Sequence, residues 1–252
     1  MRTLFYVPII HEESDLGSLG PALDMASASL FGEKRWTRHK ETVAAFWKAV
    51  AAYLDSVDPR DFRIYQDGLA ADGDLGRRIV DEAAKRGSKN HRIVLDLMGR
   101  GAQIHRTEDL SLLLEERQQV ARGSQGESSG PGAENGAEYN RQVELLTRQR
   151  DSYIAKQIND TLKEGETGIL FIGAYHDVPS YLNNDIQVIP IKDKEKVRAY
   201  FRELISSLGG RRLGHLATYL ASPVRVPGDK AKGPNSRQAA CRQALEGWPK
   251  TA

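Results

Sequence analysis

Two apolar stretches about 165 positions apart each end in a histidine followed by at least one acidic residue. The first, LFYVPII over residues 4–10, leads into His11, Glu12 and Glu13. The second, ILFIGAY over residues 169–175, leads into His176 and Asp177. Imidazole and carboxylate groups suit Zn, Mn, Co or Ni, and such a metal lowers the pKa of a bound water. We therefore predict metal ligands at His11, His176 and Asp177, with Glu12 and Glu13 completing the shell or acting as a base.

The same groups also allow a reaction without a metal. A histidine would then act as the general base, and a carboxylate would orient its ring. A plainer alternative is that each histidine only hydrogen-bonds a loop carbonyl. The sequence contains no compact metal motif such as H-E-x-x-H that would decide between these alternatives.

An arginine interrupts the apolar stripe of the helix expected over residues 138–163. Arg150 lies four residues after Leu146 and four before Ile154. A guanidinium group buried on such a stripe is unfavourable by several kcal/mol unless a carboxylate or an anionic ligand meets it. Arg150 therefore either forms a structural ion pair with Glu108 or Asp67, or stabilises negative charge on a substrate oxygen.

Polar residues also follow two other expected strands. FRIYQ over residues 62–66 ends in Gln66 and Asp67, and Glu108 follows the expected strand at 102–106. We predict that Gln66, Asp67 and Glu108 bind substrate. The alternatives are that Asp67 begins an ordinary turn and that RTED over residues 106–109 is only a helix cap.

Short apolar runs alternate with amphipathic segments along the chain, which is typical of an α/β fold. Continuous apolar strands indicate a largely parallel central sheet flanked by helices on both faces. In such sheets, ligands bind beyond the carboxyl ends of the strands. We expect strands at 3–10, 62–66, 102–106, 167–174 and 186–191, and helices at 34–57, 74–87, 89–99, from Thr107 or Asp109 to about 120, 138–163 and 194–207.

The chain is expected to form one α/β domain over residues 1–210, followed by a basic tail. Residues 122–137 hold five glycines and no large apolar residue, which indicates a flexible insertion. Residues 211–252 carry eight Lys and Arg against two Asp and Glu and are expected to be mostly disordered. This tail either keeps the protein in solution or contacts phosphate, for example in nucleic acid.

The composition indicates a water-soluble protein with a sizeable core. Of 252 residues, 40% are hydrophobic and 28% are charged, with a net charge of +2. No run reaches the roughly 18 apolar residues of a membrane helix, and the N-terminus lacks a signal-peptide pattern. A single cysteine, Cys241, excludes an internal disulfide. These features predict a cytoplasmic location without a membrane partner, and they indicate no particular oligomeric state.

Residues 145–191 resemble the C-terminal half of the TraB/Tiki-like proteins, within the superfamily of erythromycin esterases and ChaN-like proteins. The resemblance rests on a helix with the pattern R-[ND]-x-x-[ILM]-A-x-x-I, which begins here at Arg150 and Asp151. It also rests on a strand ending in G-A-x-H, here Gly173 to His176, and more loosely on residues 4–13 ending near His11. The resemblance implies an α/β fold whose site comes from both halves of the chain. It also implies a hydrolase, with metal-dependent members among its relatives.

Together, the residues and the resemblance predict a hydrolase that cleaves an ester or amide bond in a small molecule or peptide, with a divalent metal as cofactor. The alternative is a non-catalytic module that binds a small anion or a nucleotide in the same pocket.

Overall fold

Five strands form one parallel sheet at the centre of the fold. The computed structural model describes residues 1–11, 20–124, 133–206 and 210–226. The strands lie in the order β3-β2-β4-β1-β5, and every neighbouring pair is parallel. They are β1 (Arg2–Ile9), β2 (Arg63–Gln66), β3 (Gln103–His105), β4 (Thr167–Gly173) and β5 (Ile186–Pro190). The predicted α/β fold with a parallel sheet is confirmed.

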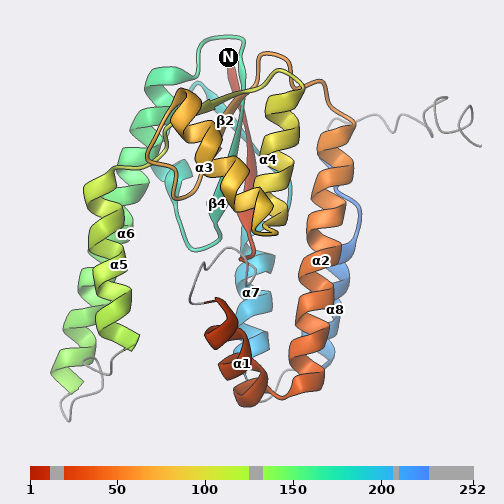
Figure 1. The fold of residues 1–252 in the computed structure, drawn as a ribbon, viewed down its shortest axis with the longest axis vertical. Coiled ribbons are helices and arrows are strands. Elements are labelled where there is room, and N and C mark those ends of the chain that lie inside the picture. The colour runs from red at the N-terminus through yellow and green to blue at the C-terminus, as the bar shows by residue number, and fades with distance from the viewer. Residues whose placement is uncertain (12–19, 125–132, 207–209, 227–252) are drawn as a thin grey trace, which may run out of the picture.

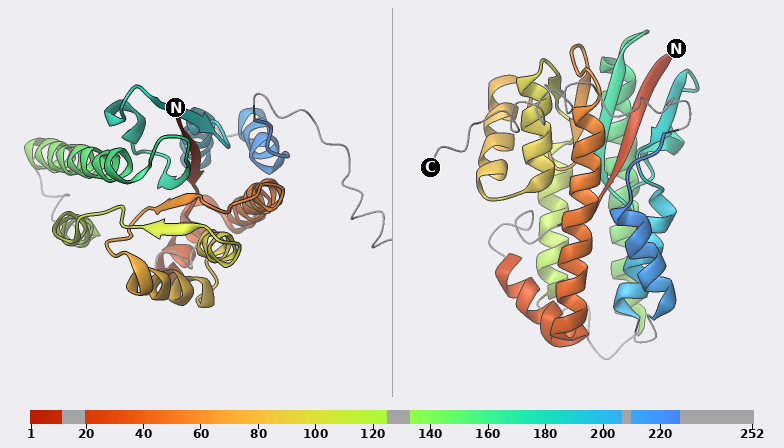
Figure 2. Two further views of the ribbon diagram at one scale, coloured as in Figure 1. Left: turned by 90° about the horizontal axis from the view of Figure 1, so that it is seen from above. Right: turned by 90° about the vertical axis from the view of Figure 1, so that its right-hand side faces the viewer.

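Helices cover both faces of this sheet, so its central strands are apolar on both sides. Along β4, Ile169 and Phe171 pack into one core cluster, while Leu170 and Ile172 pack into the other. This alternation follows from the two-residue period of a strand. α6 (Ala133–Thr161) covers the second face, and α2 (Glu33–Asp55) lies on the first (Figure 2).

The remaining helices complete these layers. They are α1 (Gly20–Phe31), α3 (Gly73–Lys85), α4 (Lys89–Gly99), α5 (Leu110–Ser124), η3 (Val178–Tyr181), α7 (Lys194–Ile205) and α8 (Arg211–Ala221). Figure 1 shows that α1, α7 and parts of α2, α5 and α6 extend past the ends of the strands. The carboxyl edge of the sheet is therefore enclosed by helices, whereas the sequence had given no indication of α1.

The apolar stripe predicted for the helix at 34–57 explains how α2 packs. Val43, Trp47, Val50 and Leu54 recur at three- and four-residue steps, and all four are buried. The indole Nε1–H of Trp47 donates a hydrogen bond to the carbonyl of Ile10 at 3.2 Å. This bond ties α2 to the segment that leads out of β1.

Both predicted boundaries of the flexible insertion at 122–137 are wrong, because the flanking helices extend into it. α5 continues to Ser124, and α6 begins at Ala133, five residues before the predicted start at Glu138. Adding a residue to an existing helix gains one backbone hydrogen bond, and this gain outweighs the low helix propensity of a single glycine. Residues 125–132 lie outside the described part of the chain.

The expectation that 211–252 forms a mostly disordered tail is wrong for residues 211–226. α8 packs against the first core cluster, where Leu220 and Val226 are buried. The ammonium of Lys192 also holds the end of α8, donating to the carbonyls of Ser222 at 2.6 Å and Tyr219 at 3.2 Å. The prediction relied on the basic composition of the whole segment and so missed the short amphipathic helix α8 at its start. Residues 227–252 lie outside the described part.

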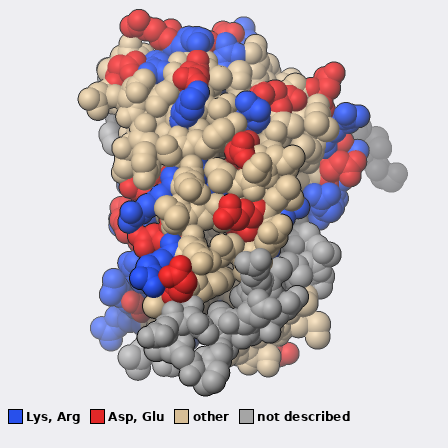
Figure 3. Space-filling view, turned by 90° about the vertical axis from the view of Figure 1, so that its left-hand side faces the viewer, with Lys and Arg blue, Asp and Glu red and all other residues tan. Residues whose placement is uncertain are grey.

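Charges of both signs are interspersed on the side of the molecule shown in Figure 3. On α6, exposed pairs four residues apart include Arg148 with Glu144 at 2.6 Å and Lys156 with Asp160 at 2.5 Å. Such exposed pairs contribute little to stability, because water screens their charges. Within the described residues, no helix has both the length and the apolar character needed to cross a membrane.

Candidate functional site

A cavity of about 630 Å³ opens beyond the carboxyl ends of the central strands. The ends of β1, β2 and β4 contribute Ile9, His11, Gln66, Asp67 and Gly173 to its lining. Helices α4, α5, α6 and α7 supply the other walls. This is where ligands bind in parallel α/β sheets, because the strands end there and their loops converge.

His176 and Asp151 form a buried pair in the wall of this cavity. After β4, the chain turns through Gly173-Ala174-Tyr175-His176, and the His176 amide closes the turn by donating to the Gly173 carbonyl at 3.1 Å. The His176 ring then contacts Asp151 on α6, with 2.6 Å between Nδ1 and Oδ1. The second oxygen of Asp151 accepts the amide of Asp177 at 2.7 Å, which fixes the carboxylate.

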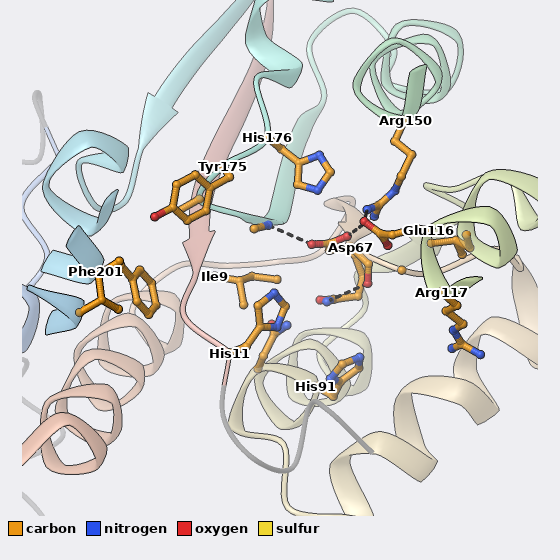
Figure 4. Close-up of a pocket in the computed structure, with 17 residues that line it drawn as sticks. Ile9, His11, Asp67, His91, Glu116, Arg117, Arg150, Tyr175, His176 and Phe201 are labelled. Carbon is orange, nitrogen blue, oxygen red and sulfur yellow. Dashed lines mark hydrogen bonds and ion pairs between the residues drawn. The ribbon is translucent and has the colours of Figure 1, made fainter. Parts of the chain in front are cut away.

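This hydrogen bond to Asp151 determines which ring nitrogen of His176 carries the proton. A carboxylate only accepts hydrogen bonds, so Nδ1 carries the proton and Nε2 keeps its lone pair in the neutral ring. Burial favours the neutral ring, but the hydrogen bond to Asp151 and the charge of Asp67 outweigh it, so the pKa of His176 lies above its ordinary value. His176 is therefore oriented as a proton acceptor whose ring points into the cavity (Figure 4).

Arg150, the neighbour of Asp151 on α6, holds three carboxylates beside the cavity. Its guanidinium donates to Glu108 through Nε at 3.2 Å and Nη2 at 2.6 Å. Nη2 also donates to Asp67 at 2.9 Å, and Nη1 donates to Glu116. The predicted structural partners, Glu108 and Asp67, are thus both engaged. All three guanidinium nitrogens donate to carboxylates.

The three central groups of this cluster titrate differently. Burial raises the pKa of Glu108 to about 7, although Arg150 opposes the shift. Burial alone would also raise the pKa of Asp67, but the charges of His176, Arg150 and His11 outweigh it and lower the pKa. The carboxylates keep the pKa of Arg150 above its ordinary value despite its burial. The cluster therefore contains a permanent cation and a stable anion at Asp67.

Gly173 marks the point at which the predicted site residues converge. Its amide donates to Asp67 Oδ2 at 3.0 Å. A Cβ atom added to Gly173 would lie 3.3 Å from Asp67 Oδ2, 3.4 Å from His176 Cδ2 and 3.8 Å from His11 Nε2. The two strand-end histidines therefore share one crevice with Asp67, because β1 and β4 are neighbouring strands (Figure 4).

Other predicted site residues lie elsewhere. Asp177 does not line the cavity, and its carboxylate accepts from Lys194 at 2.8 Å and from the Ser180 hydroxyl. Glu12 and Glu13 lie outside the described residues. Glu108 is fully buried behind Arg150 and does not line the cavity.

The described residues do not provide a complete set of metal ligands. Among them, no group of three or more His, Cys, Asp or Glu side chains is arranged to hold a metal ion. His11 and His176 converge, but both oxygens of Asp67 already accept hydrogen bonds from Arg150 and Gly173. Zn, Mn, Co or Ni therefore remains a prediction that rests on the two histidines.

Sequence reasoning missed Asp151, Glu116 and Asn90 as site residues. Asp151 lay inside the quoted helix motif, and its position next to Arg150 was the available signal. Asn90 interrupts the buried face of α4, which continues through Val94 and Leu97. A polar residue at such a position is the same signal that identified Arg150. Glu116 lies on the partly exposed side of α5 and carried no such signal.

The fold and site define a class: a parallel α/β protein with an Asp–His pair and a buried arginine–carboxylate cluster at the carboxyl edge of its sheet. A scan against protein-family models finds no match, and neither the curated proteins nor the solved structures include a significant match. The resemblance to the TraB/Tiki-like proteins therefore stays a prediction carried by the motif residues alone.

Proposed function

We propose that this protein is a hydrolase of an ester or amide bond, in which His176 acts as the general base. The observation that carries the proposal is the 2.6 Å contact between His176 Nδ1 and Asp151 Oδ1 in the wall of the cavity. A histidine held by a carboxylate on one nitrogen presents the other as a base of fixed direction. The predicted resemblance to ester-cleaving proteins points the same way.

In the proposed reaction, His176 Nε2 takes a proton from water, and the water oxygen attacks the carbonyl carbon of the substrate. The bond from that carbon to the leaving oxygen or nitrogen then breaks, and the leaving group takes up a proton. His11, on the exposed rim of the same crevice, is placed to supply this proton. Asp67 stabilises the positive charge that develops on His176. Arg150 holds Asp67 in place, which is a positioning role.

The second form of this proposal is a hydrolase that depends on a divalent metal ion. A metal-binding histidine also gives its other ring nitrogen to a carboxylate, as His176 gives Nδ1 to Asp151. His11 and His176 would then hold the ion, with further ligands from outside the described residues. We derive no step through the metal, because the described residues lack a third ligand.

The proposal is tested with a panel of 4-nitrophenyl esters and 4-nitroanilides, each assayed after treatment with EDTA and again with Zn²⁺ or Mn²⁺ added. His176→Gln keeps the size of the side chain but removes the base, so turnover should fall roughly 100-fold or more. His215→Gln is the matched control, because His215 is exposed on α8 and does not line the cavity. It should leave turnover unchanged.

Four results would decide whether the protein is a hydrolase and which form of the reaction it uses. Full activity of the His176→Gln protein would contradict the assigned base. No turnover of any member of the panel by the unmodified protein, with and without metal, would contradict the hydrolase itself. Activity that disappears with EDTA and returns with one ion would favour the metal-dependent form, and activity that EDTA leaves unchanged would favour His176 alone.

A further inference from the structure

Two buried amide side chains in the cavity lining lack partners for their carbonyl oxygens. Gln66 ends β2, and Asn90 lies in the first turn of α4. Both line the cavity, and each is only 2% exposed. Neither Gln66 Oε1 nor Asn90 Oδ1 has a hydrogen-bond partner among the described residues. A buried acceptor without a partner is unfavourable, so such groups in native proteins call for an explanation.

The orientation of the Gln66 amide is fixed by the protein itself. Its Nε2 donates to the backbone carbonyl of Asp67 at 3.3 Å. Exchanging the amide nitrogen and oxygen would set two acceptor oxygens against each other. Gln66 therefore presents its oxygen, and this oxygen can only accept a hydrogen bond.

The contrast with Asn159 on α6 shows what a structural amide in this protein does. Asn159 Nδ2 donates to the carbonyl of Tyr181 at 3.2 Å, and its Oδ1 accepts from the amide of Asn183 at 3.0 Å. It links α6 to the loop after η3, with both ends of its amide used. Gln66 and Asn90 have no such complete arrangement.

The other walls of the cavity restrict the kind of ligand that these acceptors would meet. Leu113, Phe201 and Ile205 provide apolar surface from α5 and α7. The guanidinium of Arg150 already donates to carboxylates through all three nitrogens, so it is not available as the main partner of an anion. Arg117 also lines the cavity but is exposed to solvent, so water screens its charge. At the buried amides of Gln66 and Asn90 the walls therefore favour an uncharged ligand with an apolar body.

We infer that Gln66 and Asn90 form a binding subsite for an uncharged, apolar or aromatic substrate that donates a hydrogen bond, through either an amide N–H or a hydroxyl group. The inference deepens the proposed function, on which it rests for the bond that is cleaved. The subsite itself requires only binding, so it is tested without turnover.

The test is an NMR titration of the ¹⁵N-labelled full chain with four probes of similar shape. Benzamide and benzyl alcohol donate hydrogen bonds, through N–H and O–H respectively. Acetophenone and benzoate do not, and benzoate is also an anion. The two donors should bind at least about fivefold more tightly than the other two, in line with one hydrogen bond to a buried acceptor. The tighter of the two donors identifies the group that the subsite prefers.

Two apolar variants test the named residues. Gln66→Met and Asn90→Leu should each reduce the preference for the donor probes roughly threefold to tenfold, because the acceptor is gone. The melting temperature of Asn90→Leu should stay equal or rise, since an unpaired buried oxygen has been removed. Gln66→Met also removes the 3.3 Å hydrogen bond to the Asp67 carbonyl, so its melting temperature should change little. Asn159→Leu is the control, and it should lower the melting temperature, because it removes both hydrogen bonds that link α6 to the loop after η3.

Acetophenone or benzoate binding as tightly as benzamide and benzyl alcohol would overturn the inference. So would a melting temperature in both cavity variants that falls as far as in Asn159→Leu, because the two amides would then be structural. The donor preference of the unmodified chain remains decisive if a variant fails to fold. A confirmed preference without any ester or amide turnover would contradict only the proposed hydrolase. Turnover without the preference would contradict only the subsite.

Discussion

At Arg150, one guanidinium joins three carboxylates that come from different parts of the chain. Asp67 follows β2, Glu108 lies before α5, and Glu116 is on α5 itself. Both Arg150 and Glu108 are almost inaccessible to solvent, with side-chain exposures of 4% and 0%. Breaking such a buried cluster on one side leaves charges without compensation, and this cost exceeds any net gain from forming the cluster.

Arg150→Ala should therefore lower the free energy of unfolding by about 3–5 kcal/mol, because Glu108 and Asp67 would remain buried without their cation. Urea unfolding followed by circular dichroism measures the change. Arg148→Ala on the same helix is the control. Its pair with Glu144 is exposed, so the expected change is within about 0.5 kcal/mol. A loss for Arg150→Ala as small as that of the control would show that the cluster is not a structural anchor.

The residue types were predictable from the sequence, but their pairing was not. An arginine on an apolar stripe requires an anion, and Glu108 and Asp67 were candidates because each follows a strand. That Arg150 would engage both, and Glu116 as well, depends on the distance between α5 and α6. That distance cannot be predicted from any local pattern in the sequence.

At the scale of elements, α6 organises the site through two consecutive residues. Arg150 holds the groups that follow β2 and β3, whereas Asp151 holds the histidine that follows β4. Neighbouring residues on a helix point about 100° apart, so one turn of α6 can serve two strand ends. The 3.6-residue pattern predicted this helix, but the predicted range of 138–163 starts five residues late and ends two residues late.

The largest error of the sequence analysis at this scale concerns α8, which was expected to be disordered. The packing of α8 gives a prediction about stability. Leu220 is fully buried against the first core cluster. Leu220→Ala should lower the free energy of unfolding by about 2–5 kcal/mol, through lost burial and a residual cavity. Leu30→Ala on α1 serves as the control, because Leu30 is 76% exposed. Equal stabilities of the two variants, measured by thermal unfolding, would mean that α8 is not part of the core.

At the scale of the whole molecule, the order of the strands is what brings the two histidines together. β1 and β4 are neighbours, with Ile9 opposite Gly173, so His11 and His176 leave the sheet side by side. The sequence indicated that both histidines follow strands. It could not show that β4 inserts between β1 and β2, because strand order depends on how the connecting helices pack. The shared crevice is thus a property of the topology.

The same topology places the chemistry and the binding groups in one cavity. β2 contributes Gln66 and Asp67, β4 leads to His176, and the helices close the remaining sides. A hydrolase requires such an arrangement, with a base beside a pocket that holds the substrate. The central claim is therefore that His176, oriented by Asp151, is the base of this site.

The most direct test of that claim is the pH dependence of kcat/KM for the best ester or anilide in the panel, measured for the unmodified protein and for Asp151→Asn. A base works only when it is unprotonated, so the rate should rise with pH. Its midpoint should lie above the ordinary pKa of a histidine, because burial lowers the pKa of His176 less than Asp151 and Asp67 raise it. Asp151→Asn should shift the midpoint to lower pH and reduce the plateau. An identical midpoint in both proteins would contradict the account, because His176 would then not be the group that titrates.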